Sequence, residues 1–203
     1  MQIIPQNNNV HFGARLIGSA SIKVKNAANK WVQEPVNLIK LETNKTADLG
    51  VLDSVDYLWS GRNLSGSIAE EAHIMGGGTG IYALTRQQNG FDRIKPLDIL
   101  GIMSTNSLYK TKPDSVEIFK IGTKPLYAYE QNHRQRDVKN VAKTMVKKFV
   151  EHLKKDTKAG SVVVHADPGD VKFLSRIGMK ESGSTPLVPR FELKRADFDS
   201  FVG

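Results

Sequence analysis

The chain has 203 residues, of which 39% are hydrophobic and 25% are charged, a composition typical of a folded domain with its own core. It has no cysteine and no apolar run long enough to cross a bilayer, which excludes disulfides and thiolate metal sites and leads us to expect a cytoplasmic protein. Its net charge of +8 favours anionic partners such as nucleic acid or a phosphorylated small molecule, although solubility alone would explain the same excess.

The chain is predicted to consist of an N-terminal extension, residues 1–35, and a single domain, residues 36–203. The extension starts with a polar stretch, residues 1–9, which we expect to be disordered. Residues 21–25 alternate between polar and apolar side chains, a pattern that predicts an added strand.

Strands and helices then alternate along residues 36–203, without a linker that would divide them. Thr46 or Asp48 is suited to cap a first helix that runs through Trp59 and ends near Gly61. Three more helices are predicted at 68–75, 138–155 and 168–177. Short apolar or alternating runs predict strands at 36–41, 81–85, 97–103, 116–121, 161–165 and 191–194. This order of elements indicates an α+β fold.

The longest predicted helix, residues 138–155, starts with an excess of positive charge. Its apolar residues repeat at intervals of three and four, which predicts one buried face. A helix N-terminus already carries a partial positive charge and unpaired N–H groups, so extra cations there indicate an anion, usually phosphate. The alternative is a solvated helix start that Asp137 caps. The cations concerned are Arg134, Arg136, Lys139 and Lys143.

Three segments carry a family resemblance. Residues 116–125 are similar to a central strand, residues 136–145 to a loop-and-helix pattern Arg/Gln-x-x-Gly-x-Gly/Ala, and residues 166–179 to a closing motif Asn…Phe-Tyr-x-Lys-x-Gly-Phe. Asn140 and Ala142 stand at the two glycine positions of the loop, and Asn tolerates the left-handed region better than most residues. Together these segments resemble the GNAT superfamily of acyl-CoA-dependent N-acyltransferases.

The resemblance implies a mixed, mostly antiparallel central sheet flanked by helices, with acetyl-CoA or another acyl-CoA as cosubstrate. Arg134 and Arg136 would add charge-assisted hydrogen bonds to its diphosphate. Asp167 stands at the asparagine position of the closing motif and would lie near the CoA phosphates. The N–H groups expected to bind the diphosphate are those of Val138, Lys139, Asn140, Val141 and Ala142.

Catalysis, on this resemblance, is transfer of an acetyl group to an amine by direct attack in a ternary complex. Glu117 resembles the carboxylate that serves as base in several family members, and strand alternation predicts that it shares a face with Phe119 and Ile121 and is partly buried. The thioester carbonyl would be polarised by backbone N–H groups of Ile121, Gly122 and Thr123.

The proton donor for the leaving thiolate is less clearly marked. Leu174 stands where many family members carry a tyrosine, and leucine has no proton to donate. Tyr129 is therefore the candidate acid, with Tyr127 and His133 as nearby alternatives.

Two functions remain open at this point. One is an N-acetyltransferase that acts on a small-molecule or peptide amine. The other is a catalytically inactive GNAT-like module that binds an anionic or protein partner. Nucleic acid belongs to this second class, as an unspecific partner suited to the charge. The five histidines have no spacing typical of metal ligands, so no metal is expected.

Overall fold

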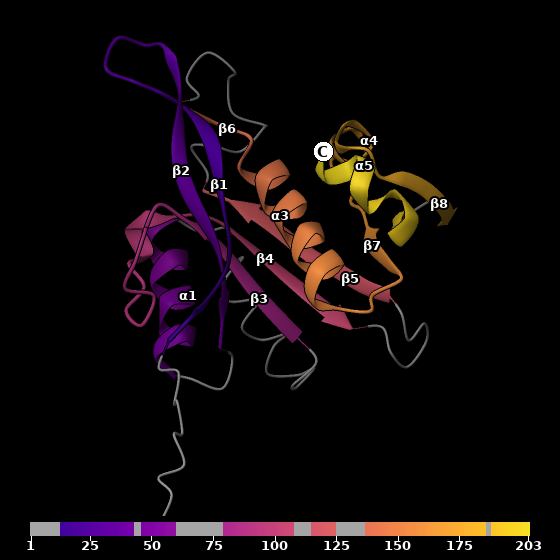
Figure 1. The fold of residues 1–203 in the computed structure, drawn as a ribbon, viewed down its shortest axis with the longest axis horizontal. Coiled ribbons are helices and arrows are strands. Elements are labelled where there is room, and N and C mark those ends of the chain that lie inside the picture. The colour runs from indigo at the N-terminus through magenta and orange to yellow at the C-terminus, as the bar shows by residue number, and fades with distance from the viewer. Residues whose placement is uncertain (1–12, 43–45, 60–78, 108–114, 125–136, 186–187) are drawn as a thin grey trace, which may run out of the picture.

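One nine-stranded sheet organises the protein in the computed structural model, which describes residues 13–42, 46–59, 79–107, 115–124, 137–185 and 188–203. The strands lie in the order β6-β1-β2-β3-β4-β5-β7-β9-β8 (Figure 1). Neighbouring strands are antiparallel except β5 and β7, which are parallel. The predicted α+β fold with a mixed, mostly antiparallel sheet is confirmed.

The described elements begin and end close to most of the predicted positions. The strands are β1 Arg15–Lys25, β2 Trp31–Leu41, β3 Thr79–Thr85, β4 Ile99–Ser107, β5 Ser115–Thr123, β6 Val138–Lys139, β7 Ser161–His165, β8 Lys180–Thr185 and β9 Val188–Lys194. The helices are α1 Thr46–Leu58, α3 Val141–Asp156, α4 Val171–Ile177 and α5 Phe198–Val202, and short 3-10 turns occupy Pro96–Asp98 and Arg195–Asp197. Among the described helices, none combines the length and apolarity needed to span a bilayer.

Helices pack on both faces of the sheet. On one face, Leu52, Val55 and the following Trp59 bring α1 against apolar residues of β2, β3 and β4. On the other face, α3 lies across the strands (Figure 1), and its predicted apolar stripe is buried, including Met145 and Phe149. The helices α4 and α5 contribute to this second cluster. We refer to the two sides as the α1 face and the α3 face.

The start of α3 differs from the prediction. Val138 and Lys139 form β6 and pair with β1, so the helix begins at Val141 and not at residue 138. Asn140 lies between them in the left-handed region, at φ 70° and ψ 14°, which ends the extended segment and starts the helix.

Other differences are smaller. The predicted helix at 168–177 begins at Val171, and the sequence did not predict β6, β8 or α5. The predicted helix at 68–75 and the stretch 1–9 lie outside the described residues.

At the N-terminal side, β1 pairs with β2 from residue 15 to residue 25, so the strand predicted at 21–25 is confirmed and is longer than expected. The strand β2 runs across the boundary predicted between residues 35 and 36. The division into an extension and a domain stays a prediction.

Candidate active site

The first turn of α3 presents N–H groups that no side chain in the described part of the protein caps. The first intrahelical hydrogen bond runs from Thr144 N to Asn140 O, at 2.8 Å. The N–H groups of the three preceding helical residues therefore have no acceptor within the helix. The Asn140 side chain makes no capping hydrogen bond either. The α3 start thus carries free donors and the positive end of the helix dipole, which suits an anion. The three residues are Val141, Ala142 and Lys143.

The side chain predicted to add charge at this point is directed elsewhere. The Lys139 ammonium lies 4.1 Å from the centre of the Trp31 ring, and the Lys25 ammonium lies 5.7 Å from it. Asp137 is exposed and lies 3.9 Å from Lys25 Nζ. Lys139 is thus held by a cation–π contact at the β1–β2 hairpin. Arg134 and Arg136, like the candidate acid Tyr129, lie outside the described residues.

The second half of β5 leaves its parallel neighbour. The strands β5 and β7 pair only from Ser115–Ser161 to Ile118–Val164. Beyond this point β5 continues against β4 through the three residues predicted to polarise a carbonyl, and no other described strand pairs with it there. Because N–H groups along a strand point alternately to its two sides, some of these amides point away from β4. The three residues are Ile121, Gly122 and Thr123, opposite Met103, Ile102 and Gly101.

A β-bulge changes the face on which the candidate base lies. Ser104 pairs with Lys120 and Thr105 with Ile118, so Phe119 is the extra residue. Ile121 packs on the α3 face, whereas Glu117 lies between two residues of that cluster and so points to the α1 face. The expectation that Glu117 and Ile121 share a face was therefore wrong, because the bulge shifts the alternation by one residue.

Glu117 is buried, as expected, and it has a partner that the sequence reasoning missed. Its side chain is 10% exposed, and Oε1 lies 2.6 Å from Nδ1 of His165, whose side chain is 46% exposed. His165 is the last residue of β7, directly after the last residue paired with β5. The sequence feature that could have pointed to His165 was its position at the end of a strand predicted to be buried.

Two further residues stand near the closing motif. Asp167 is exposed, and its carbonyl accepts the N–H of Asp170 in the turn before α4. Leu174, at the tyrosine position, is buried in the cluster on the α3 face. In this position it packs the core and presents no polar group.

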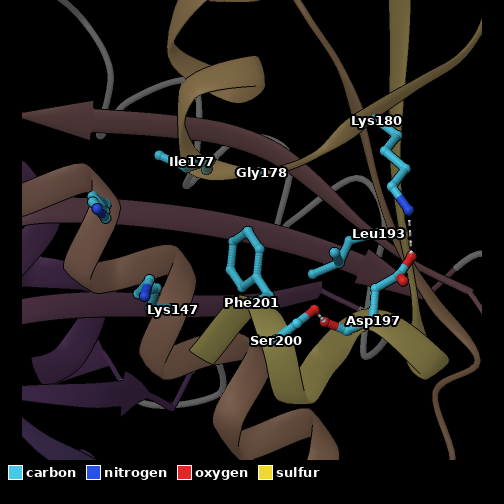
Figure 2. Close-up of a pocket in the computed structure, with 9 residues that line it drawn as sticks. Lys147, Ile177, Gly178, Lys180, Leu193, Asp197, Ser200 and Phe201 are labelled. Carbon is cyan, nitrogen blue, oxygen red and sulfur yellow. Dashed lines mark hydrogen bonds and ion pairs between the residues drawn. The ribbon is translucent and has the colours of Figure 1, made fainter. Parts of the chain in front are cut away.

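A cavity of about 230 Å³ lies among α3, α4 and α5 (Figure 2). The cations Lys143, Lys147 and Lys180 line it, and Lys180 donates a hydrogen bond to Asp197 at 3.2 Å. Its apolar lining residues Ile177, Leu193 and Phe201 belong to the α3-face cluster. It is therefore on the opposite side of the sheet from Glu117.

Comparison with known proteins assigns the fold. The sequence matches no protein-family model and no curated protein. A chimera of the spermidine N-acetyltransferase SpeG from Vibrio cholerae and hSSAT is 14% identical, with a TM-score of 0.53; the match covers 81% of this chain and 98% of that chain. A putative N-acetyltransferase from Lactobacillus plantarum is 8% identical, with a TM-score of 0.52 and coverage of 78% and 97%. A structure described as a bacterial toxin is 16% identical, with a TM-score of 0.52 and coverage of 81% and 93%.

This chain has the GNAT fold. The strand β5 and the start of α3 contain the residues that the sequence resemblance matched to a central strand and to a loop-and-helix pattern. Asn140, at the first glycine position, adopts the left-handed conformation that a glycine would adopt most easily.

Proposed function

We propose that this protein is an N-acetyltransferase that moves an acetyl group from acetyl-CoA to an amine. The observation that carries the proposal is a juxtaposition within the GNAT fold. A hydrogen-bonded pair of the buried Glu117 carboxylate and the half-exposed His165 imidazole lies where β5 and β7 stop pairing, and the start of α3, whose first N–H groups have no intrahelical acceptor, comes later in the chain.

The residues present fit an acyl-CoA in two respects. The N–H groups after Asn140 suit a diphosphate, since the described residues offer them no acceptor. The β5 amides from Ile121 to Thr123 suit a thioester carbonyl, since β7 no longer pairs beside them. Bound acetyl-CoA would supply the activated acyl group. Arg134, Arg136, Lys139 and Asp167 are assigned to the phosphates by the resemblance, and Lys139 would have to leave Trp31 to contact them.

Acetyl transfer also requires that the amine lose a proton and that the departing thiolate gain one. The Glu117–His165 pair is suited to the first task because it is a hydrogen-bonded base on the α1 face of the sheet. We assign the second task to Tyr129. Direct attack in a ternary complex requires no covalent intermediate on the enzyme.

The acceptor is proposed to be a cationic amine, either a small molecule or a peptide. The SpeG chimera is described as a spermidine N-acetyltransferase. In this chain, the buried carboxylates Glu117 and Glu192 lie on either side of Val163 of β7 and on the same face of the sheet. Carboxylates there would favour an ammonium group at the entrance.

The first test is titration of acetyl-CoA by calorimetry, with thermal shift as a second readout. We expect binding to the wild type, and we expect the double variant Arg134→Glu/Arg136→Glu to weaken it by a few kcal/mol if both side chains contact phosphate. The matched control is Lys158→Glu/Lys194→Glu, which changes the net charge equally at two exposed positions near the C-terminal end of α3. Absence of binding at millimolar acetyl-CoA would refute the proposal.

One observation favours the second candidate, a binding module for an anionic partner. Trp31 is 37% exposed at the β1–β2 hairpin and is flanked by Lys25 and Lys139. An aromatic ring among cations suits a nucleic acid base and its phosphates. If this is the function, binding of single-stranded oligonucleotides will persist at moderate salt and Trp31→Ala will weaken it. Retention only at low salt would indicate a general charge effect.

A further inference from the structure

The carboxylate–imidazole pair is asymmetric in its exposure. Glu117 is almost fully enclosed, whereas nearly half of the His165 side chain is exposed. The hydrogen bond between them uses Nδ1 of the imidazole, so Nε2 is the ring nitrogen left for other contacts. Only the imidazole of this pair therefore offers a basic atom that an incoming molecule can reach without displacing its partner.

The hydrogen bond also sets which nitrogen carries the proton. An ionised carboxylate is an acceptor only, so with Glu117 ionised the neutral imidazole must carry its hydrogen on Nδ1. Nε2 then has a free lone pair. This is the arrangement in which a buried carboxylate orients a catalytic histidine and stabilises its charged form.

The surroundings of the ring are polar and charged. Directly opposite His165 on β9 is Arg190, which shares its face of the sheet. The Arg190 guanidinium donates to Ser182 Oγ at 2.7 Å and lies 3.5 Å from Glu192, so its charge is partly compensated. From β5, Glu117 is the facing group, and in the turn after β7 the exposed carboxylate is Asp167. The charged residues around the ring are thus one cation, Arg190, and three carboxylates, Glu117, Glu192 and Asp167.

We propose that His165 Nε2, and not Glu117, is the atom that takes the proton from the attacking amine, and that Glu117 is a positioning residue that acts through the imidazole. This inference rests on the proposed acetyltransferase function. The amine nitrogen forms the new C–N bond as the C–S bond breaks. The displaced amine proton moves to Nε2, the electron pair of the broken bond leaves on the thiolate, and Glu117 compensates the imidazolium charge.

The test compares His165→Gln and Glu117→Gln, with His152→Gln on α3 as the matched control. The pH dependence of kcat/KM is measured with acetyl-CoA and spermidine, by release of free thiol. We expect His165→Gln to lose roughly 10²–10⁴-fold in kcat/KM and to lose the rising limb of the profile. Glu117→Gln should keep that limb, with a smaller loss in kcat/KM because the base itself remains. Added imidazole should restore part of the rate of His165→Ala.

The opposite pattern would overturn the inference: a limb that survives in His165→Gln and disappears in Glu117→Gln makes Glu117 the base. An independent readout needs no acceptor. Nitrogen-15 NMR of the imidazole, assigned by the signal missing in His165→Gln, should show hydrogen on Nδ1 in the neutral form, and hydrogen on Nε2 would refute the proposal. Calorimetry with acetyl-CoA distinguishes failure of the proposed function from failure of the proposed role of His165. If the wild type does not bind acetyl-CoA, the function is refuted. If it binds acetyl-CoA but the neutral imidazole carries its hydrogen on Nε2, only the role of His165 is refuted.

Discussion

Asn140 gives the most direct test of how the start of α3 is built. It is exposed, makes no capping hydrogen bond and has φ 70°, so its main contribution is to tolerate the left-handed conformation. That conformation costs roughly 1–2 kcal/mol for most L-residues, less for asparagine and almost nothing for glycine. We therefore expect Asn140→Gly to raise the free energy of unfolding by roughly 0.5–1 kcal/mol, Asn140→Ala to lower it by about 1 kcal/mol, and Asn140→Val to lower it by about 2 kcal/mol, because β-branched residues tolerate positive φ worst.

The assay is urea denaturation at constant pH, with the free energy extrapolated to zero denaturant. The control is Ala142→Gly, two residues further along the chain but inside the helix, where glycine should lower the free energy of unfolding by about 1 kcal/mol. The sign of a glycine substitution should thus reverse between positions 140 and 142. If Asn140→Gly is destabilising to the same extent as Ala142→Gly, the left-handed cap is refuted. Calorimetry on the same variants should show the weakest acetyl-CoA binding for Asn140→Val, because a residue that leaves this conformation redirects the N–H groups after it.

Three further predictions concern the packing and titration of the fold. A Cβ on Gly101 would lie 2.5 Å from Met145 Sδ, so Gly101→Ala should lower the free energy of unfolding by roughly 1–3 kcal/mol. In a double-mutant cycle measured by urea denaturation, Gly101→Ala with Met145→Ala should be less destabilised than the sum of the two single variants. Strict additivity would contradict the close approach. Burial raises the pKa of Tyr82 from 10.0 to about 12. The stability that the neutral phenol contributes is therefore complete below pH 10 and falls by up to about 3 kcal/mol between pH 10 and 12. Tyr82→Phe should remove this part of the pH dependence of the free energy of unfolding, and an unchanged slope would refute the assignment to Tyr82. Hydrogen bonds from Lys148 and Lys155 lower the pKa of Glu151. The ionised carboxylate therefore contributes roughly 0.5 kcal/mol to stability above the ordinary carboxyl pKa, and this contribution is lost as pH falls. Glu151→Gln should destabilise the protein at pH 7 but not at pH 3, which thermal unfolding at both pH values will check.

The elements that the sequence predicted well are those whose pattern is local and strong. The buried β-branched run 161–165 and the three- and four-residue spacing of α3 needed no distant partner to be recognised. The strand β8 was not predicted because its sequence, Lys-Glu-Ser-Gly-Ser-Thr, is polar and contains glycine, as an edge strand permits. The short helix α5 is held by Phe198 and Phe201 in the core beside α3, a contact that no local pattern reveals.

The start of α3 was mispredicted for a physical reason. Val138 continues the apolar spacing of the helix, so periodicity alone includes it. In the structure, the pairing of Val138 with Val24 of β1 takes precedence, and the left-handed Asn140 separates the strand from the helix. Both the pairing and the cation–π contact of Lys139 depend on the β1–β2 hairpin, which is more than a hundred residues away in the chain.

The candidate site shows the same division between local and long-range information. Glu117 became a candidate through its resemblance to the carboxylate that serves as base in several family members, whereas its partner His165 was missed because only the parallel pairing of β5 and β7 brings the two together. The bulge at Phe119 adds a consequence that alternation could not predict. By shifting the register once, it directs Glu117 to the α1 face while Ile121 packs against α3. In the proposed transferase, one strand would then provide both the amides assigned to the thioester carbonyl and the carboxylate that positions the base, which would hold the reacting groups close together.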